Sequence, residues 1–105
     1  MVKKAVNLNR VPTKCRVLLF LKDNGAMWTT DISEKVFAET NTPNTNRWKW
    51  VIRFYLLEMQ INGMVKFVDN RIADPSYYGE DNILETKYEI TKFGIQRLED
   101  VVGVI

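Results

Sequence analysis

The sequence predicts a single domain of mainly α-helical class with one small antiparallel β-hairpin. Three observations predict this class. The chain has 105 residues, of which 46% are apolar, and this is enough for one domain with its own core. Four segments repeat apolar residues at helical spacing, and two short segments near the C-terminal end alternate as strands do. We expect a basic arm over residues 1–11 and the folded domain over residues 12–105.

The first half of the chain predicts three helices. Pro12 suits the first turn of a helix over residues 12–23, which Asn24-Gly25 ends. Residues 26–28 are short and apolar, and they predict a minimal strand. Thr29, Thr30 and Asp31 are candidate N-caps, and Asp31 with Glu34 three residues later resembles a capping box, so a second helix is expected over about residues 31–40. A loop of turn-forming and capping residues, 41–46, precedes a third helix, which begins at Thr45 or Asn46 and ends at residue 61.

The second half predicts a hairpin and a last helix. Residues 64–68 and 86–90 are the two expected strands, and the polar residues 69–85 between them are expected to form a loop. Thr91 is expected to cap a final helix that runs to about Val102. The order is therefore helix, short strand, helix, helix, strand, loop, strand, helix.

Two motifs carry a resemblance to a known class of proteins. Residues 56–65, LLEMQINGMV, are similar to the end of a recognition helix entering a β-hairpin, and residues 88–98, YEITKFGIQRL, resemble the return strand entering the last helix. With the element order, these motifs resemble the winged helix-turn-helix fold of small MarR, PadR and ArsR regulators over about residues 12–102. The composition is also similar to that of archaeal and archaeal-virus proteins. The resemblance implies a cytoplasmic, homodimeric transcriptional regulator that binds a specific sequence of double-stranded DNA.

In that class the third helix enters the major groove and the hairpin, or wing, touches the neighbouring backbone or minor groove. The matching positions form the expected DNA-binding set: Thr45, Asn46, Arg47, Lys49, Trp50, Arg53 and, on the wing, Arg71. Asn and Arg side chains can make paired hydrogen bonds to base edges, and a helix N-terminus can hold a phosphate. Charge supports this expectation, because residues 1–53 carry ten Lys and Arg against four Asp and Glu, whereas residues 54–105 carry five against nine.

The third helix carries two apolar stripes. One stripe, Trp48, Ile52, Tyr55, Leu56 and Met59, has the spacing expected to face the other helices. The other comprises Trp50, Phe54, Leu57 and Ile61 and occupies part of the face that DNA would meet. Three hypotheses account for it: cover by the N-terminal arm or the last helix, a homodimer contact, or a protein partner. The third makes the chain an interaction module without DNA contact. The wing also favours that alternative, because residues 69–85 carry one base, Arg71, against five acids: Asp69, Asp74, Glu80, Asp81 and Glu85.

The composition argues against an enzyme. The chain has no histidine and a single cysteine, and its five glycines are too scattered for a phosphate-binding loop, so no cofactor, metal site or catalytic residue is predicted. Cys15 lies in an apolar run and is expected to be a small core residue. No apolar run approaches the roughly 20 residues that span a bilayer, so no membrane contact is expected.

Overall fold

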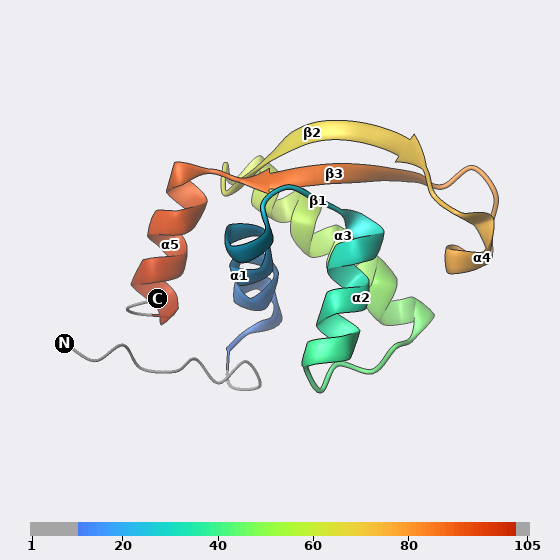
Figure 1. Ribbon diagram of the computed structural model, residues 1–105, viewed down its shortest axis with the longest axis horizontal. Helices are drawn as coiled ribbons and strands as arrows, with labels where there is room; N and C mark the ends of the chain where they lie inside the picture. Colours follow the sequence, from blue (N-terminus) through green and yellow to red (C-terminus); the bar gives the residue numbers. More distant parts are fainter. Residues whose placement is uncertain (1–10, 103–105) are drawn as a thin grey trace.

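The computed structural model describes residues 11–102 and places them in one α+β domain (Figure 1). The helices are α1 (Thr13–Asn24), α2 (Thr29–Glu39), α3 (Asn46–Ile61), α4 (Pro75–Tyr78) and α5 (Lys92–Val102). The strands are β1 (Met27–Trp28), β2 (Val65–Ile72) and β3 (Leu84–Ile90). The predicted class is confirmed at this level. Of the predicted arm, all but Val11 lies outside the described residues.

The three strands form one antiparallel sheet in the order β1-β3-β2, and α1, α2 and α3 lie against one of its faces (Figure 1). The core lies between this sheet face and the helices. α1 contributes a run of buried apolar residues from 17 to 21, and α3 contributes Ile52, Leu56 and Met59. The predicted inward stripe of the third helix is therefore confirmed for these three residues, while Trp48 and Tyr55 are only partly buried.

The prediction that Asp31 and Glu34 begin the second helix was wrong. α2 starts two residues earlier, at Thr29. Its first turn forms hydrogen bonds with another element. The Glu85 carboxylate on β3 accepts hydrogen bonds from the backbone N–H of Thr30, at 3.0 Å, and from the Thr30 hydroxyl. The Thr29 hydroxyl donates to the carbonyl of Thr86 at 2.8 Å. Because β3 supplies the cap, a local capping box is not needed.

The predicted loop over residues 69–85 was also wrong in part, because β2 continues to Ile72 and β3 begins at Leu84. The register shifts between Phe67 and Asp69, so Val68 is an extra residue in β2. Polar pairs then continue the ladder, including a hydrogen bond from the Thr86 hydroxyl to the Asn70 side chain at 2.9 Å. We call residues 65–90 the β2–β3 ribbon.

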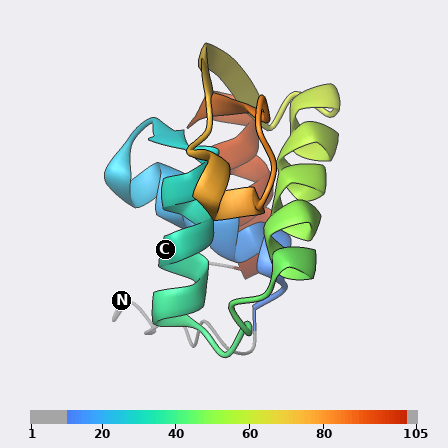
Figure 2. The same cartoon turned by 90° about the vertical axis from the view of Figure 1, so that its right-hand side faces the viewer.

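At the end of the ribbon, Asp74-Pro75-Ser76 begins the short helix α4, which the sequence analysis did not predict. The Asp74 side chain accepts a hydrogen bond from the Ser76 N–H at 2.9 Å, and Pro75 occupies the first turn. Figure 2 shows α4 lying between α2 and α3. The end of the ribbon is therefore folded back against the helices.

The last helix closes the domain on the other side of α1. Thr91 caps it as predicted, since its hydroxyl accepts a hydrogen bond from the Gly94 N–H at 3.0 Å. The Thr91 N–H donates to the Met64 carbonyl at 3.0 Å, which ties the start of α5 to the start of β2. Gly94 lies so close to this carbonyl that a Cβ atom would collide with it. Packing at this corner therefore requires glycine.

Cys15 packs against the core from α1 and is half-buried, in agreement with its predicted role. Burial raises the pKa of its thiol above the ordinary value, although the Arg97 charge opposes this effect. The thiolate is the reactive form, so we expect Cys15 to react with an aromatic disulfide reagent at pH 7 about tenfold more slowly in the folded protein than in denaturant. Equal rates with and without denaturant would contradict this expectation.

Candidate nucleic-acid interface

The N-terminal end of α3 is fixed by the connection from α2. The Arg16 guanidinium reaches from α1 to the Thr42 hydroxyl at 3.4 Å, and the Thr42 N–H donates to the Thr40 hydroxyl at 3.2 Å. Thr45 is the N-cap, and its hydroxyl accepts a hydrogen bond from the Trp48 N–H at 3.2 Å. The predicted start of this helix is confirmed. The connection is therefore anchored on the core and holds the first turn of α3 in place.

The first turn of α3 exposes polar side chains that the rest of the described chain does not use. Thr45, Asn46 and Arg47 are all exposed. Within residues 11–102, the side chains of Asn46 and Arg47 make no hydrogen bond or ion pair. They lie beside backbone N–H groups that a helix leaves unpaired at its start. This end of α3 can therefore donate hydrogen bonds to an anion or a base.

Lys49, one turn further along, contacts α4. Its ammonium donates to the Tyr77 carbonyl at 2.7 Å and lies 4.1 Å from the centre of the Tyr77 ring. Burial, together with the nearby Glu34 carboxylate, raises the pKa of the Tyr77 phenol, so this ring remains neutral. Lys49 therefore connects the third helix to the end of the ribbon.

Arg53 makes a similar connection to β3. Its guanidinium donates to the Leu84 carbonyl at 2.6 Å and lies 5.1 Å from the Trp50 ring and 5.2 Å from the Tyr78 ring. Trp50 itself packs on Tyr78 with 5.2 Å between ring centres, and Tyr78 is buried. Three of the predicted DNA-binding residues, Lys49, Trp50 and Arg53, thus hold the ribbon end against α3.

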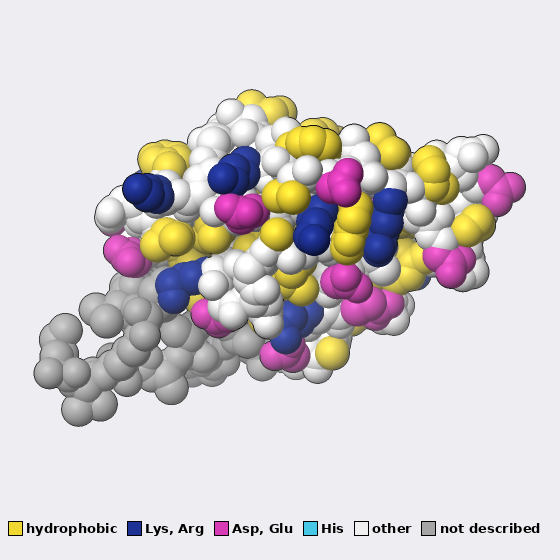
Figure 3. Space-filling model, turned by 45° about the horizontal axis from the view of Figure 1, so that its top comes forward, with side chains coloured by type: hydrophobic (Ala, Val, Ile, Leu, Met, Phe, Trp, Pro, Cys, Tyr) yellow, Lys and Arg dark blue, Asp and Glu magenta, His cyan; other side chains and the backbone are white. Residues whose placement is uncertain are grey.

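Arg71 lies apart from the other predicted site residues. Its guanidinium pairs with the buried Glu85 carboxylate and stacks 4.1 Å from the Trp28 ring. These contacts are on the sheet face turned away from α3, where Lys66 and Glu89 also pair at 3.3 Å. On the face shown in Figure 3, basic side chains are separated by acidic and apolar ones. The structure therefore brings Thr45, Asn46 and Arg47 together but does not bring Arg71 to them.

The second apolar stripe of α3 is largely exposed. The exposed fractions are 73% for Phe54, 50% for Leu57 and 79% for Ile61, whereas Trp50 is partly covered by Tyr78. The hypothesis that the last helix covers this stripe was wrong, because α5 packs against α1 instead (Figure 1). Residues 1–10 of the N-terminal arm lie outside the described residues.

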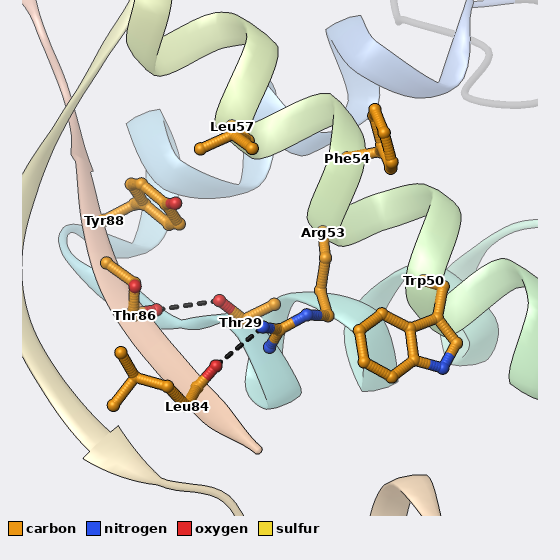
Figure 4. A pocket seen from close by; sticks show the side chains of 8 residues that line it. All are labelled: Thr29, Trp50, Arg53, Phe54, Leu57, Leu84, Thr86 and Tyr88. Carbon is orange, nitrogen blue, oxygen red and sulfur yellow. Dashed lines mark hydrogen bonds between the residues drawn. The ribbon is translucent and has the colours of Figure 1, made fainter.

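Beside this stripe, a pocket of about 330 Å³ opens between α3 and β3 (Figure 4). Leu57 projects toward Tyr88, and Arg53 extends toward the Leu84 carbonyl. Leu84, 49% exposed, continues the apolar surface across to the strand. We call Phe54, Leu57, Ile61 and Leu84 the apolar face.

Two contributors to this region, Glu85 and α4, were not among the predicted site residues and elements. Glu85 was counted only among the acids of a polar loop, although it is 1% exposed and organises the start of α2. Nothing in its local pattern indicates this role, because its partners come from distant parts of the chain. The helix α4 did have a signal, since Asp74 followed by Pro75 is typical of a helix start.

No known family, curated protein or solved structure matches the chain. Among residues 11–102 there is no group of three or more acidic or cysteine side chains that could hold a metal ion. The same residues contain no helix with the length and apolar character needed to cross a membrane.

Proposed function

We propose that the chain is a winged helix-turn-helix protein that binds double-stranded DNA as a homodimeric transcriptional regulator. In this assignment α2 and α3 are the helix-turn-helix, α3 is the recognition helix and the β2–β3 ribbon is the wing. The element order supports the assignment, because a short strand precedes α2 and the antiparallel ribbon follows α3 directly. Fold alone does not define a function, so the proposal depends on the surface of α3.

The observation that carries the proposal is the exposed first turn of α3, in which the Asn46 and Arg47 side chains have no partner in the described part of the chain. Asn46 and Arg47 have the side chains that read adenine and guanine edges in the major groove. Thr45 and the free N–H groups of the first turn suit a phosphate. From residue 46 to residue 57, α3 carries three cations and no acid, so nothing on this half of the helix repels the DNA backbone.

Lys49 and Arg53 have a supporting role in this proposal. Their charges lie on the same half of α3, but their polar atoms hold the wing. They would attract DNA over a distance and keep the wing in place, while Asn46 and Arg47 make the direct contacts. Replacing Arg53 would therefore disturb both the wing and the charge, and it does not separate these two effects.

Arg47→Ala tests the proposal most directly, because the Arg47 side chain has no hydrogen-bond or ion-pair partner among residues 11–102. We expect its affinity for a preferred duplex to fall about 10-fold to 100-fold, with a shallower dependence on salt. Asn46→Ala should weaken the preferred duplex more than a random one. The measurement is a fluorescence-anisotropy titration over a series of salt concentrations, after selection of a preferred sequence from random duplexes.

Lys92→Ala is the matched control. Lys92 is an exposed cation at the start of α5, so this substitution removes the same charge as Arg47→Ala. It should retain nearly the full affinity. Equal affinities of the Arg47 variant, the control and the unchanged protein would overturn the assignment of α3 as the recognition helix.

A second candidate function is favoured by the apolar face. Winged helices can also act as protein-docking modules, and three large apolar side chains on the exposed surface of α3 suit such a role. Absence of duplex binding by the folded protein at low salt would favour this candidate over the regulator.

A further inference from the structure

We infer that the apolar face joins two copies of this chain and sets the two α3 N-terminal ends one DNA turn apart. The two-fold axis passes near Leu57, and the two α3 helices run antiparallel across it. The spacing part of this inference rests on the proposed DNA-binding function. The interface itself does not, and it can be measured without DNA.

The apolar face is contiguous. On α3, Phe54 and Leu57 are three residues apart and Leu57 and Ile61 are four apart, so all three share one side of the helix. Leu84 reaches the same surface from β3, because it lines one pocket with Phe54 and Leu57. Four large apolar side chains that are each about half exposed or more therefore form one surface.

The area of this surface suits a dimer. With roughly 190 Å² as the full area of a large apolar residue, the four exposed fractions amount to roughly 450 Å² per chain. Pairing two copies removes roughly 900 Å² of apolar surface before any polar rim is added. Specific interfaces bury about 1,200 Å² or more in total, so a modest rim completes the requirement.

The surface is also complementary to itself. A two-fold interface needs a patch that carries both the projections and the hollows that receive them. Here Phe54 projects from α3 with 73% of its surface exposed, beside the pocket of about 330 Å³ between α3 and β3. Arg53 lines the same pocket, where its guanidinium donates to the Leu84 carbonyl, whereas Glu58 pairs with Lys14 of α1. Arginine and aromatic side chains are enriched in interfaces, whereas lysine and glutamate are depleted.

The length of α3 gives the spacing. A helix rises 1.5 Å per residue, so the 11 residues from Asn46 to Leu57 span about 17 Å. Antiparallel pairing about Leu57 therefore separates the two Asn46 positions by about 34 Å. Successive major grooves on one side of a duplex are about 34–36 Å apart. The same contact that covers the apolar face thus presents two first turns to two half-sites.

The first test is the oligomeric state, measured by light scattering and sedimentation. We expect a dimer for the unchanged protein and a monomer for Phe54→Glu and for Leu57→Glu, each with an unchanged circular-dichroism spectrum. Phe93→Glu is the matched control, because Phe93 is 52% exposed on α5, outside the apolar face. It should remain a dimer. A monomeric unchanged protein, or dimers of all three variants, would overturn the inference.

The second test is the distance between the two α3 ends. A spin label on Arg47→Cys should give one distance distribution centred at about 35 Å by double electron-electron resonance, without DNA. The half-buried Cys15 is replaced by Ala in a matched sample, so that only one label is present per chain. A dimer with labels closer than about 20 Å or farther than about 50 Å would overturn the proposed arrangement.

DNA binding is then measured on the unlabelled, unchanged protein, because the spin label replaces Arg47. If the labelled dimer shows the expected distance but the unchanged protein ignores duplex DNA, the interface is supported and the proposed function fails. If Phe54→Glu remains folded and monomeric and loses affinity for a two-half-site duplex more than for a single half-site, both are supported.

Discussion

Glu85→Ala is expected to lower the free energy of unfolding by about 3 kcal/mol, a large fraction of the stability of a domain of this size. The Glu85 side chain is 1% exposed and accepts hydrogen bonds from the Thr30 N–H, the Thr30 hydroxyl and the Arg71 guanidinium. Alanine leaves the Thr30 groups without an acceptor at a buried position. It also leaves the Arg71 charge without its partner.

Urea unfolding followed by circular dichroism measures this effect. Glu89→Ala is the control, since Glu89 lies on the same strand in an exposed pair with Lys66. Exposed pairs contribute less than about 1 kcal/mol, so this variant should unfold nearly as the unchanged protein does. The unfolding midpoint of Glu85→Gln should lie between those of Glu85→Ala and Glu89→Ala, because the Gln side chain retains a hydrogen-bond acceptor for Thr30. A Glu85→Ala midpoint equal to that of Glu89→Ala would refute the role of Glu85.

Gly94→Ala is expected to destabilise the domain by about 2 kcal/mol or more, although alanine normally favours a helix over glycine by about 1 kcal/mol. The new Cβ would collide with the Met64 carbonyl oxygen and lie 2.8 Å from the Ile90 side chain. The Met64 carbonyl cannot move freely, because it accepts a hydrogen bond from the Thr91 N–H. The start of α5 must therefore separate from β2.

Glu99→Ala distinguishes this collision from a general effect on the helix. Glu99 is exposed on α5, so alanine there should leave stability unchanged or raise it slightly. Thermal unfolding of both variants is the measurement. If Gly94→Ala proved as stable as Glu99→Ala, the close approach of α5 to Met64 would be wrong.

The parts of the fold that depend on local signals could be predicted from the sequence. The start of α3 at Asn46 follows from Thr45, whose hydroxyl caps its own helix. The start of α5 follows from Thr91 in the same way. The start of α2 could not be predicted, since its cap comes from Glu85, which is 55 residues away in the sequence. The length of β2 was missed because hydrogen bonds between polar side chains replace the apolar alternation beyond Phe67.

The candidate site shows a similar division. Helical spacing predicted which side chains of α3 share a side, and the exposure of Phe54, Leu57 and Ile61 agrees with a separate second stripe. The local sequence could not show that Lys49 and Arg53 hold the ribbon end. Their partners are the backbone carbonyls of Tyr77 and Leu84. Every residue has a backbone carbonyl, so the residue types in the sequence do not indicate such an acceptor.

The extra residue in β2 determines which side chains meet on each side of the ribbon. Before it, Phe67 pairs with Tyr88 on the side of α3, and after it Ile72 pairs with Leu84 on that same side. An odd-numbered and an even-numbered position thus share one surface, because Val68 inverts the parity of the strand. A ladder without this bulge would pair Val68 with Lys87 and Arg71 with Leu84, which would exchange the two surfaces beyond Phe67 and turn Arg71 away from Glu85. Deleting Val68 would keep the observed pairs. One inserted residue therefore sets the alternation of side chains between the two surfaces in the outer half of the ribbon.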